Sequence, residues 1–493
     1  MLHLTSPKFW AIVVTVVMAV FAAFSVANAF RRRGKDWASD DSHAVQPAQS
    51  RADERRLMVI GLAVVLTAAV VGLMVFFLGV LHKPYDLHQC NSPIYANFAS
   101  RIAHGLLPYR DFSVEYPPLA IPLLMIPGHS SNVGTYTNWF NIEMYLVCLA
   151  AAAATAAAAA RLWHTAGKAC LAGVAFAACV LAAGSIVGNR YDAVVALVLA
   201  VFLLMLAYEK WRAAALLPGL GFALKLTPAI LLPLVFVLGV RRRTVAWSLV
   251  CFALGAVLPF VPFMIHGVGG LAYPFTYQLD RPLEVESVLA TPLLVGHVLN
   301  AVKVEISGGY GSMNVVASGA ATLARISVFL ELAALGLTYW LIWRRRATLR
   351  SMPELVPLAV LAVVLAFVTF GKVLSPQYFV WILPAIALVF PARRVLGVLL
   401  VGTVMLTQIV FPWNWLSTLE LTRGPVLVLV ERNFWLVVVF ALSLWHLWRL
   451  PNADSTEVTT PGRIRLSGAA GIGPHSLLVL ATDQKSLPHR TCG

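Results

Sequence analysis

The feature that most constrains this chain is a succession of long apolar runs separated by short arginine-rich clusters. Runs of about 20 apolar residues match the thickness of the hydrocarbon core of a membrane. The clusters lie at 31–35, 55–56, 241–243, 344–346 and 393–394. Positive residues gather in this way in cytoplasmic loops, so the net charge of +15 indicates topology rather than nucleic-acid binding. At 59% hydrophobic and 12% charged residues, a chain of 493 residues lacks the polar surface of a soluble protein.

The arginine clusters all fall on one side if the apolar runs alternate in direction. Residues 9–30 predict a span with its N-terminus outside, because a signal peptide has the opposite charge polarity. Residues 31–56 predict a cytoplasmic linker, and residues 57–81 predict a span that leads outward. Further spans are predicted at 138–160, 169–187, 193–208, 244–265, 318–343, 354–371, 379–390, 395–412 and 434–448. The expected fold is an all-α polytopic membrane protein with about 11–13 transmembrane helices.

Three regions follow from this topology. Residues 1–56 form an extra helix and a linker, residues 57–450 form the membrane domain, and residues 451–493 form a disordered cytoplasmic tail. The apolar stretch 213–240 is too long for one span and too short for two. We therefore expect a hairpin of two half-helices whose apex brings Lys225 to a polar cavity in the membrane.

The longest polar segment between two spans is the loop 82–118, which opens a predicted extracytoplasmic region, 82–137. Apolar residues at near-helical spacing predict an amphipathic helix from Ser92 to His104. Residues 119–127 are too short to span and predict a re-entrant or interfacial piece. Ionisable groups kept beside a membrane indicate chemistry, although a loop of this kind can also be a solvated face.

Four polar segments share the predicted outer side: 82–118, 189–192, 280–287 and 372–378. Carboxylates suited to general-base chemistry are Asp86, Asp111, Glu115, Asp192, Glu284 and Glu286. Cations suited to holding a phosphate are Arg110, Arg190, Lys225, Arg281 and Lys372. Together they suit transfer of a group from a lipid-linked phosphate at the membrane boundary.

Structural roles remain open for several of these residues. Asp192 stands at the start of an apolar run, where it could simply cap a helix. Glu284 and Glu286 could be surface charges, and Lys225 could be paired for structural reasons alone. The six cysteines show no metal-binding spacing, and we predict neither a bound metal nor a cofactor.

The sequence Gly-Leu-Leu-Pro-Tyr-Arg-Asp-Phe-Ser-Val-Glu-Tyr-Pro-Pro at 105–118, preceded by Tyr95, resembles the first external loop of glycosyltransferase family 87. This family belongs to the GT-C superfamily. Further stretches agree in order: Arg-Tyr-Asp at 190–192, a Gly-Leu-Gly-Phe-Ala-Leu-Lys-Leu-Thr-Pro segment at 219–228, and Leu-Ser-Pro-Gln-Tyr-Phe-Val-Trp at 374–381. The segment 278–287 also resembles a family pattern with Glu-Ser. The likeness covers roughly residues 57–450.

The resemblance implies a GT-C fold and a mannosyltransferase. The donor would be mannose on a polyprenyl monophosphate, and a lipid or glycan acceptor would receive it with inversion and without a metal. Membrane lipids would be further partners. The donor-binding residues implied by the likeness and by charge are Asn91, Tyr95, Arg110, Tyr116, Arg190, Asp192, Lys225, Glu286, Lys372, Gln377 and Tyr378.

One position departs from the family pattern. The family commonly has an aspartate, taken as the catalytic base, four residues before the tyrosine that matches Tyr95, and here that position is Asn91. An amide cannot act as a general base. The base is therefore sought among Asp86, Asp111 and Glu115, with Asp111 or Asp86 favoured. Two alternative functions remain. A transporter or flippase of lipid-linked or small anionic substrates would suit the broken hairpin. A catalytically inactive homologue would be consistent with Asn91.

Overall fold

The computed structural model describes residues 92–128, 132–163, 165–239, 242–265 and 269–451. Within these residues, seven helical segments are long and apolar enough to cross a membrane. They are Val133–Trp163 (α5), Ala166–Ala183 (α6), Val245–Met264 (in α11 to α12), Ala320–Arg344 (α15), Pro353–Phe370 (η6 and α17), Arg394–Trp413 (α19 and η7) and Arg423–Trp448 (α21). The chain is an all-α polytopic membrane protein, as predicted. The predicted spans at 9–30 and 57–81 and the tail 451–493 lie almost wholly outside the described residues.

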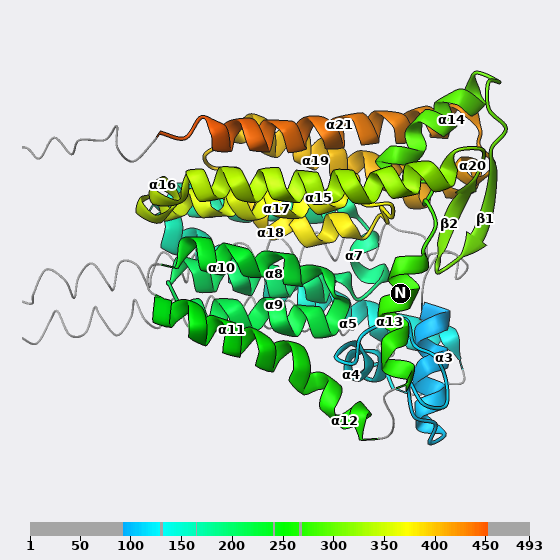
Figure 1. Ribbon diagram of the computed structural model, residues 1–493, viewed down its shortest axis with the longest axis horizontal. Coiled ribbons are helices and arrows are strands. Elements are labelled where there is room, and N and C mark those ends of the chain that lie inside the picture. Colours follow the sequence, from blue (N-terminus) through cyan, green and yellow to red (C-terminus); the bar gives the residue numbers. More distant parts are fainter. Residues whose placement is uncertain (1–91, 129–131, 164, 240–241, 266–268, 452–493) are drawn as a thin grey trace, which may run out of the picture. The chain divides into compact units, whose positions relative to one another are not determined.

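Shorter apolar helices complete the bundle. They are Asp192–Ala207 (α8), Thr227–Leu238 (η2 and α10), Val288–Val298 (η5 and α14) and Tyr378–Val389 (α18). The candidate span Val245–Met264 is made of α11 (Arg242–Val257), η3 (Leu258–Phe260) and α12 (Val261–Met264). Further helices are α7 (Ile186–Asn189), α9 (Trp211–Lys225), α16 (Arg346–Ser351) and α20 (Trp415–Leu419). Figure 1 shows the long helices running side by side along the long axis of the view.

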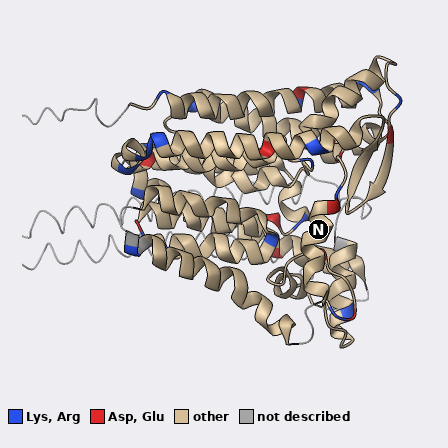
Figure 2. Ribbon diagram, in the orientation of Figure 1, with Lys and Arg blue, Asp and Glu red and all other residues tan. Residues whose placement is uncertain are grey.

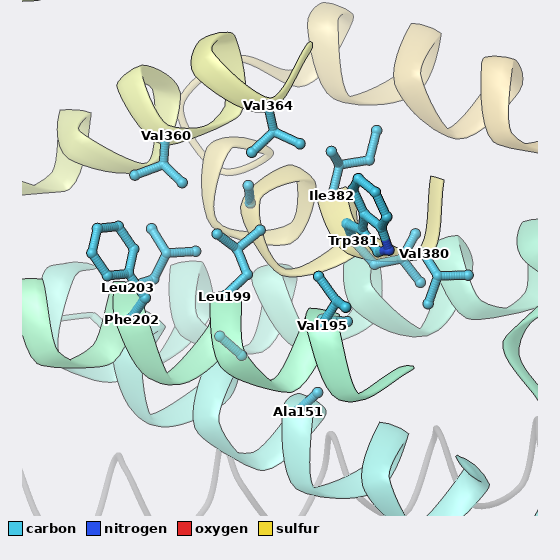
Figure 3. Close-up of a cluster of buried hydrophobic side chains, with 14 of the residues drawn as sticks. Ala151, Val195, Leu199, Phe202, Leu203, Val360, Val364, Val380, Trp381 and Ile382 are labelled. Carbon is cyan, nitrogen blue, oxygen red and sulfur yellow. The ribbon is translucent and has the colours of Figure 1, made fainter. Parts of the chain in front are cut away.

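The core forms where α8, α17 and α18 meet. All twelve residues of α18 are buried, and α17 (Val356–Phe370) is buried along most of its length. Figure 3 shows Leu199 and Phe202 of α8 facing Val360 and Val364 of α17, with Trp381 of α18 beside them. Because lipid is as apolar as these side chains, close packing rather than escape from water holds such helices together.

Small residues allow the closest helix contacts. The Ala-rich half of α5 is largely buried and packs along α8. Helices α9 and α11 also pack closely, and a Cβ added at Gly219 would lie 2.3 Å from the Phe252 carbonyl oxygen. A Cβ at Gly255 would lie 2.7 Å from the Leu216 carbonyl oxygen. These two glycines therefore set the distance between the helices.

The stretch 213–240 is broken as predicted. Helix α9 ends at Lys225, and Leu226 has a positive φ of 53° that a helix cannot continue. The chain resumes as η2 (Thr227–Leu231) and α10 (Leu232–Leu238), which packs against α9. The break leaves Lys225 at a helix end beside a cavity rather than in the middle of a span.

Charged residues gather at the two ends of the bundle (Figure 2). At one end, Arg350 donates hydrogen bonds to the carbonyl oxygens of Val237, Leu238 and Gly239 at the C-terminus of α10. Arg345 donates to the carbonyl oxygen of Trp448 at the end of α21, at 2.6 Å. Arginines at helix C-termini satisfy otherwise unpaired carbonyls, so two of the arginine-rich regions meet at this end.

The other end carries the short elements that surround the candidate site. They are α3 (Ser92–Ala103), α4 (Ala120–Met125), η4 (Gly269–Ala272), α13 (Tyr273–Asp280) and a hairpin of β1 (Glu305–Gly309) and β2 (Ser312–Val316). The strands pair antiparallel with Gly309 opposite Ser312. Residues 283–285 extend this sheet, because the Val285 N–H donates to Met313 and the Val315 N–H donates to Leu283, each at 2.9 Å.

Two predictions for helices need comment. The helix predicted at Ser92–His104 is confirmed as α3, and Tyr95, Phe98 and Ala99 form its buried face. The last span was predicted to begin at 434, which is wrong, because α21 begins at Arg423. Arg432 and Asn433 directly precede position 434 in the sequence, and both side chains are buried within the helix.

Candidate functional site

A polar cavity of about 550 Å³, counting its open mouth, lies at the end of the bundle that carries α3, α13 and the hairpin. Segments far apart in sequence contribute to its wall. The lining residues are Tyr95, Glu115, Tyr116, Pro117, Arg190, Tyr191, Lys225, Leu226, Tyr277, Gln278, Arg281, Tyr310, Gly311, Gln377 and Tyr378. We call this space the polar cavity.

The loop 105–118 delivers Glu115 to the polar cavity through a tight local turn. Tyr109 has a φ of 67°, and its N–H donates to the Phe112 carbonyl oxygen at 3.0 Å. The Tyr109 hydroxyl donates to the Tyr116 carbonyl oxygen at 2.6 Å, which ties the turn to the residue after Glu115. The Leu119 N–H then donates to Ala223 of α9 at 2.9 Å. The loop is thus fixed to the helix that carries Lys225.

Glu115 is half-buried and is the carboxylate in the wall of the polar cavity. Burial raises the pKa of Glu115, while its hydrogen bonds and the positive charge of Arg281 act in the opposite direction. A carboxylate with a raised pKa holds a proton more readily than an exposed one. Glu115 therefore has the position and the basicity that a proton acceptor needs.

Three cations face the same space: Arg190, Lys225 and Arg281. Neither arginine forms an ion pair with a carboxylate among the residues that the structure describes. Arg281 is only 8% exposed, and its guanidinium donates to Gln278 at 3.4 Å. A buried guanidinium without a directly paired carboxylate is costly, so the polar cavity is suited to an anion. A phosphate group matches the fork geometry of arginine.

Lys225 is held by a buried carboxylate at the start of α8. Its Nζ lies 2.6 Å from Oδ1 of Asp192, and the same oxygen accepts a 2.6 Å hydrogen bond from Nε1 of Trp381. The Lys225 ammonium also lies 4.9 Å from the ring of Tyr191 and 5.6 Å from that of Tyr378. Asp192 does not cap α8, whose N-cap position is Tyr191 and has no side-chain cap; it positions a cation at the cavity wall instead.

Aromatic rings pack against one another around this cation. The ring centroid of Tyr191 lies 5.1 Å from that of Tyr116 and 6.1 Å from that of Tyr95. Tyr95 packs on Phe140 of α5 at 5.2 Å. Aromatic pairs of this kind stabilise by about 0.5–1.5 kcal/mol each and fix the wall of the cavity.

Residues 114–304 match the family model of glycosyltransferase family 87. The match contains Glu115, Arg190, Asp192, Lys225 and Arg281, which form the charged part of the site. Over these residues the chain is similar to glycosyltransferase family 87. The match and the long apolar helices support a membrane glycosyltransferase of the GT-C type. No curated protein matches the chain.

The structure brings together about half of the site residues predicted from the sequence. Those that line the polar cavity are Tyr95, Glu115, Tyr116, Arg190, Lys225, Gln377 and Tyr378. Asp192 lies directly behind Lys225. Asp86 and Asn91 fall outside the described residues, so their positions stay predictions.

Other predicted residues lie away from the cavity wall. Asp111 is exposed and pairs with Arg110 at 2.8 Å, and its carboxylate accepts a 2.8 Å hydrogen bond from the Leu107 N–H. Lys372 donates to the Leu279 carbonyl oxygen at 2.6 Å and supports the segment that precedes Arg281. Glu286 is buried with its Oε1 atom 3.8 Å from Nη2 of Arg432.

The Glu-Ser segment serves as a brace behind the site. Glu284 accepts from the Leu374 N–H at 2.7 Å and from the Ser375 hydroxyl at 2.9 Å, which links it to the segment carrying Gln377 and Tyr378. From α21, Arg432 donates to the Glu286 carbonyl oxygen and Asn433 to the Ser287 carbonyl oxygen. Glu284 is therefore a buried positioning group rather than a surface charge.

Sequence reasoning missed Tyr277, Tyr310 and Gly311 in the cavity wall. A signal for the last two was present, because Tyr-Gly stands between two short runs containing β-branched residues at 302–306 and 313–316. A glycine in a two-residue connection is a hairpin signal. Tyr277 lies on the short helix α13, whose pattern gives no such indication.

Proposed function

We propose that this chain is a family 87 enzyme that transfers a hexose, mannose in the first place, from a polyprenyl-phosphate donor to a lipid or glycan acceptor on the extracytoplasmic face. The observation that carries the proposal is the pairing, in one cavity, of a half-buried carboxylate with three cations. The proposed regions of the chain remain the membrane domain, 57–450, with the loop 82–137 as the active-site loop.

Glu115 would act as the general base. Its carboxylate would take the proton of the acceptor hydroxyl as that oxygen attacks the anomeric carbon of the donor sugar from the face opposite the phosphate. The bond between the anomeric carbon and the phosphate oxygen breaks, and its electron pair stays on the polyprenyl phosphate. Attack from the opposite face inverts the anomeric centre. Asp111 is less suited to this role, because it is exposed and held in an ion pair by Arg110.

The cations would stabilise the leaving phosphate. Arg190 and Arg281 can each offer two N–H donors to a phosphate, and Lys225 adds a positive charge held in place by Asp192. Donors fixed before the reaction stabilise developing charge without reorganisation. This arrangement needs no nucleotide, which agrees with a lipid monophosphate as the leaving group.

A second, apolar pocket supports a lipid-linked donor. It measures about 310 Å³ and is lined by Val195, Val198, Leu199, Thr227, Pro228, Ile230, Leu231, Val364 and Trp381. Two of its lining residues follow Leu226 of the polar cavity directly in sequence. The Lys225 ammonium lies 5.3 Å from the Trp381 ring, so a phosphate-binding cation stands beside an apolar surface.

The test is incubation of membranes containing the enzyme with radiolabelled polyprenyl-phosphate-mannose, followed by identification of the labelled product. We expect transfer by the wild type and a loss of about 10²–10⁴-fold in Glu115→Gln, the range typical of a removed general base. Asp111→Asn is the matched control and should retain activity. Full activity in Glu115→Gln would contradict the assignment of the base. No transfer from any polyprenyl-phosphate sugar would favour an inactive homologue or a transporter.

A further inference from the structure

The hairpin β1–β2 places one aromatic ring at the mouth of the polar cavity. Its two-residue connection is Tyr310-Gly311, and both residues line the cavity. Their φ angles are 53° and 62°, which is the left-handed pair that a type I′ turn requires. Asn-Gly is the favoured sequence for this turn, and a tyrosine at the first position is disfavoured. A residue that departs from the local preference in this way is a candidate for a functional role.

The base of the hairpin is firmly held. Residues 283–285 add to its edge through two backbone hydrogen bonds of 2.9 Å. The side chain of Asn314 donates to the Gly309 carbonyl oxygen at 3.0 Å, which fixes the strand next to the turn. Tyr310 is therefore carried by a rigid element, the kind of support that a binding subsite needs.

Tyr310 is the outer member of a row of three tyrosine rings. Its ring centroid lies 5.4 Å from that of Tyr277, which in turn lies 5.7 Å from that of Tyr273. Tyr310 is 42% exposed and Tyr273 is 38% exposed, whereas Tyr277 is half-buried in the cavity wall. The row thus presents aromatic surface from inside the cavity to its outside.

The two residues of β1 that precede Tyr310 are glycines and carry no side chains. Gly308 and Gly309 are exposed, and neither has a positive φ. A Cβ at Gly308 would lie 3.7 Å from Met313 Sδ, and one at Gly309 would lie 3.6 Å from Asn314 Nδ2, both ordinary contact distances. Packing and backbone geometry therefore do not require glycine there. Two glycines keep open the surface next to an exposed ring.

We propose that Tyr310, Tyr277 and Tyr273 form a stacking subsite for sugar rings of the acceptor. Sugar rings combine an apolar C–H face with hydroxyls at the edge, and tyrosine offers a flat face with a polar tip. Gln278 and Glu115 in the same wall can accept hydrogen bonds from such hydroxyls. The acceptor is then a saccharide or a glycan-bearing molecule rather than a simple lipid alcohol. This inference rests on the proposed transferase function.

The experiment uses the full-length protein in lipid nanodiscs and measures the binding of an α-linked mannose disaccharide by saturation-transfer NMR. Tyr310→Asn removes the ring but installs the preferred Asn-Gly turn, so loss of binding does not reflect a weakened hairpin. We expect about tenfold weaker disaccharide binding in Tyr310→Asn and near wild-type binding in Tyr310→Phe. Tyr208→Asn is the matched control, because Tyr208 is 40% exposed and lies outside the cavity wall. It should bind like the wild type.

Steady-state kinetics separate the subsite from the transfer reaction. The KM for the polyprenyl-phosphate donor should be unchanged in Tyr310→Asn, because the ring is assigned to the acceptor. If Tyr310→Asn binds the disaccharide as the wild type does, or raises the KM for the donor instead of weakening disaccharide binding, the subsite proposal is wrong. The transferase proposal would be unaffected by either result. Disaccharide binding that depends on Tyr310 in a protein that transfers no hexose supports the subsite and contradicts the transferase proposal.

Discussion

Glu115 owes its raised pKa to burial, and Arg281 opposes that shift through its positive charge. The base form of a carboxylate exists above its pKa, so transfer should fall as pH drops through a value above the ordinary range of glutamate. Arg281→Met removes the opposing charge, raises the Glu115 pKa further and should move the acidic limb of kcat/KM to higher pH. Arg281→Lys keeps a charge and should leave the limb close to its wild-type position. Profiles of kcat/KM against pH test this. If the acidic limb lies at the same pH in the wild type, Arg281→Met and Arg281→Lys, Glu115 is not the titrating base.

The Asp192–Lys225 pair allows stability and donor binding to be separated. Lys225→Met leaves the Asp192 carboxylate, 1% exposed, without its cation, and should destabilise the protein by about 3–5 kcal/mol. The double variant Lys225→Met/Asp192→Asn removes the orphaned charge and should recover most of that stability. Thermal unfolding of the purified proteins tests this comparison.

Donor binding should not recover in the double variant. Both Lys225→Met and the double variant lack the cation assigned to the phosphate, so each should show a donor KM raised by about tenfold or more. A double variant with a wild-type donor KM would mean that Lys225 serves only to neutralise Asp192.

At the level of single residues, sequence reasoning identified the right residue types but not which ones face inward. Asp111 and Glu115 stand four residues apart in one loop, and no periodicity distinguishes them. The left-handed Tyr109 and its hydrogen bond to the Tyr116 carbonyl decide that Glu115 points to the cavity and Asp111 to the surface. The sequence does indicate the position of Lys225, because a lysine inside an apolar stretch has few alternatives to a polar cavity.

Among the elements, α21 supports the site from behind through Arg432. This side chain is fully buried, donates to the Glu286 carbonyl oxygen at 2.9 Å and lies 3.8 Å from the Glu286 carboxylate. Arg432→Met should destabilise the protein by about 3–5 kcal/mol, because the buried Glu286 carboxylate would be left without its cation. Arg432→Met/Glu286→Gln should recover part of this loss, as measured by thermal unfolding. Equal destabilisation in the single and double variants would indicate that the backbone hydrogen bond, and not the ion pair, is what matters.

The same arginine explains an element that sequence reasoning placed wrongly. Arg432 and Asn433 interrupt the hydropathy of 423–448, directly before the start predicted for the span at 434. In the folded chain, both donate to carbonyl oxygens at 286–287, so their polar groups are compatible with a continuous helix. These partners lie 146 positions away, and a local window cannot detect them. The hairpin escaped notice for a different reason, since its short strands have little hydrophobic pattern beside such long spans.

For the whole molecule, the spans follow from composition because the bilayer leaves few choices. Backbone groups must be satisfied within each segment, so long apolar runs become helices. The predicted segments 138–160, 169–187 and 318–343 agree with α5, α6 and α15 to within a few residues. The packing of these helices depends on close contacts such as that of Gly219 with α11. Hydropathy alone does not predict such contacts.

The orientation of the bundle in the membrane gives the last prediction. The arginine-rich end around α16 should face the cytoplasm, and the hairpin end should face outward. Ser307 in β1 and Ser351 at the end of α16 are both exposed, so serine-to-cysteine changes there are conservative and matched. With Cys90 and Cys492 replaced by serine, a membrane-impermeant maleimide should label Ser307→Cys in intact cells. Ser351→Cys should be labelled only after permeabilisation. The reverse pattern would place the polar cavity in the cytoplasm and rule out an extracytoplasmic reaction, since the cavity and the hairpin tip share Tyr310 and Gly311.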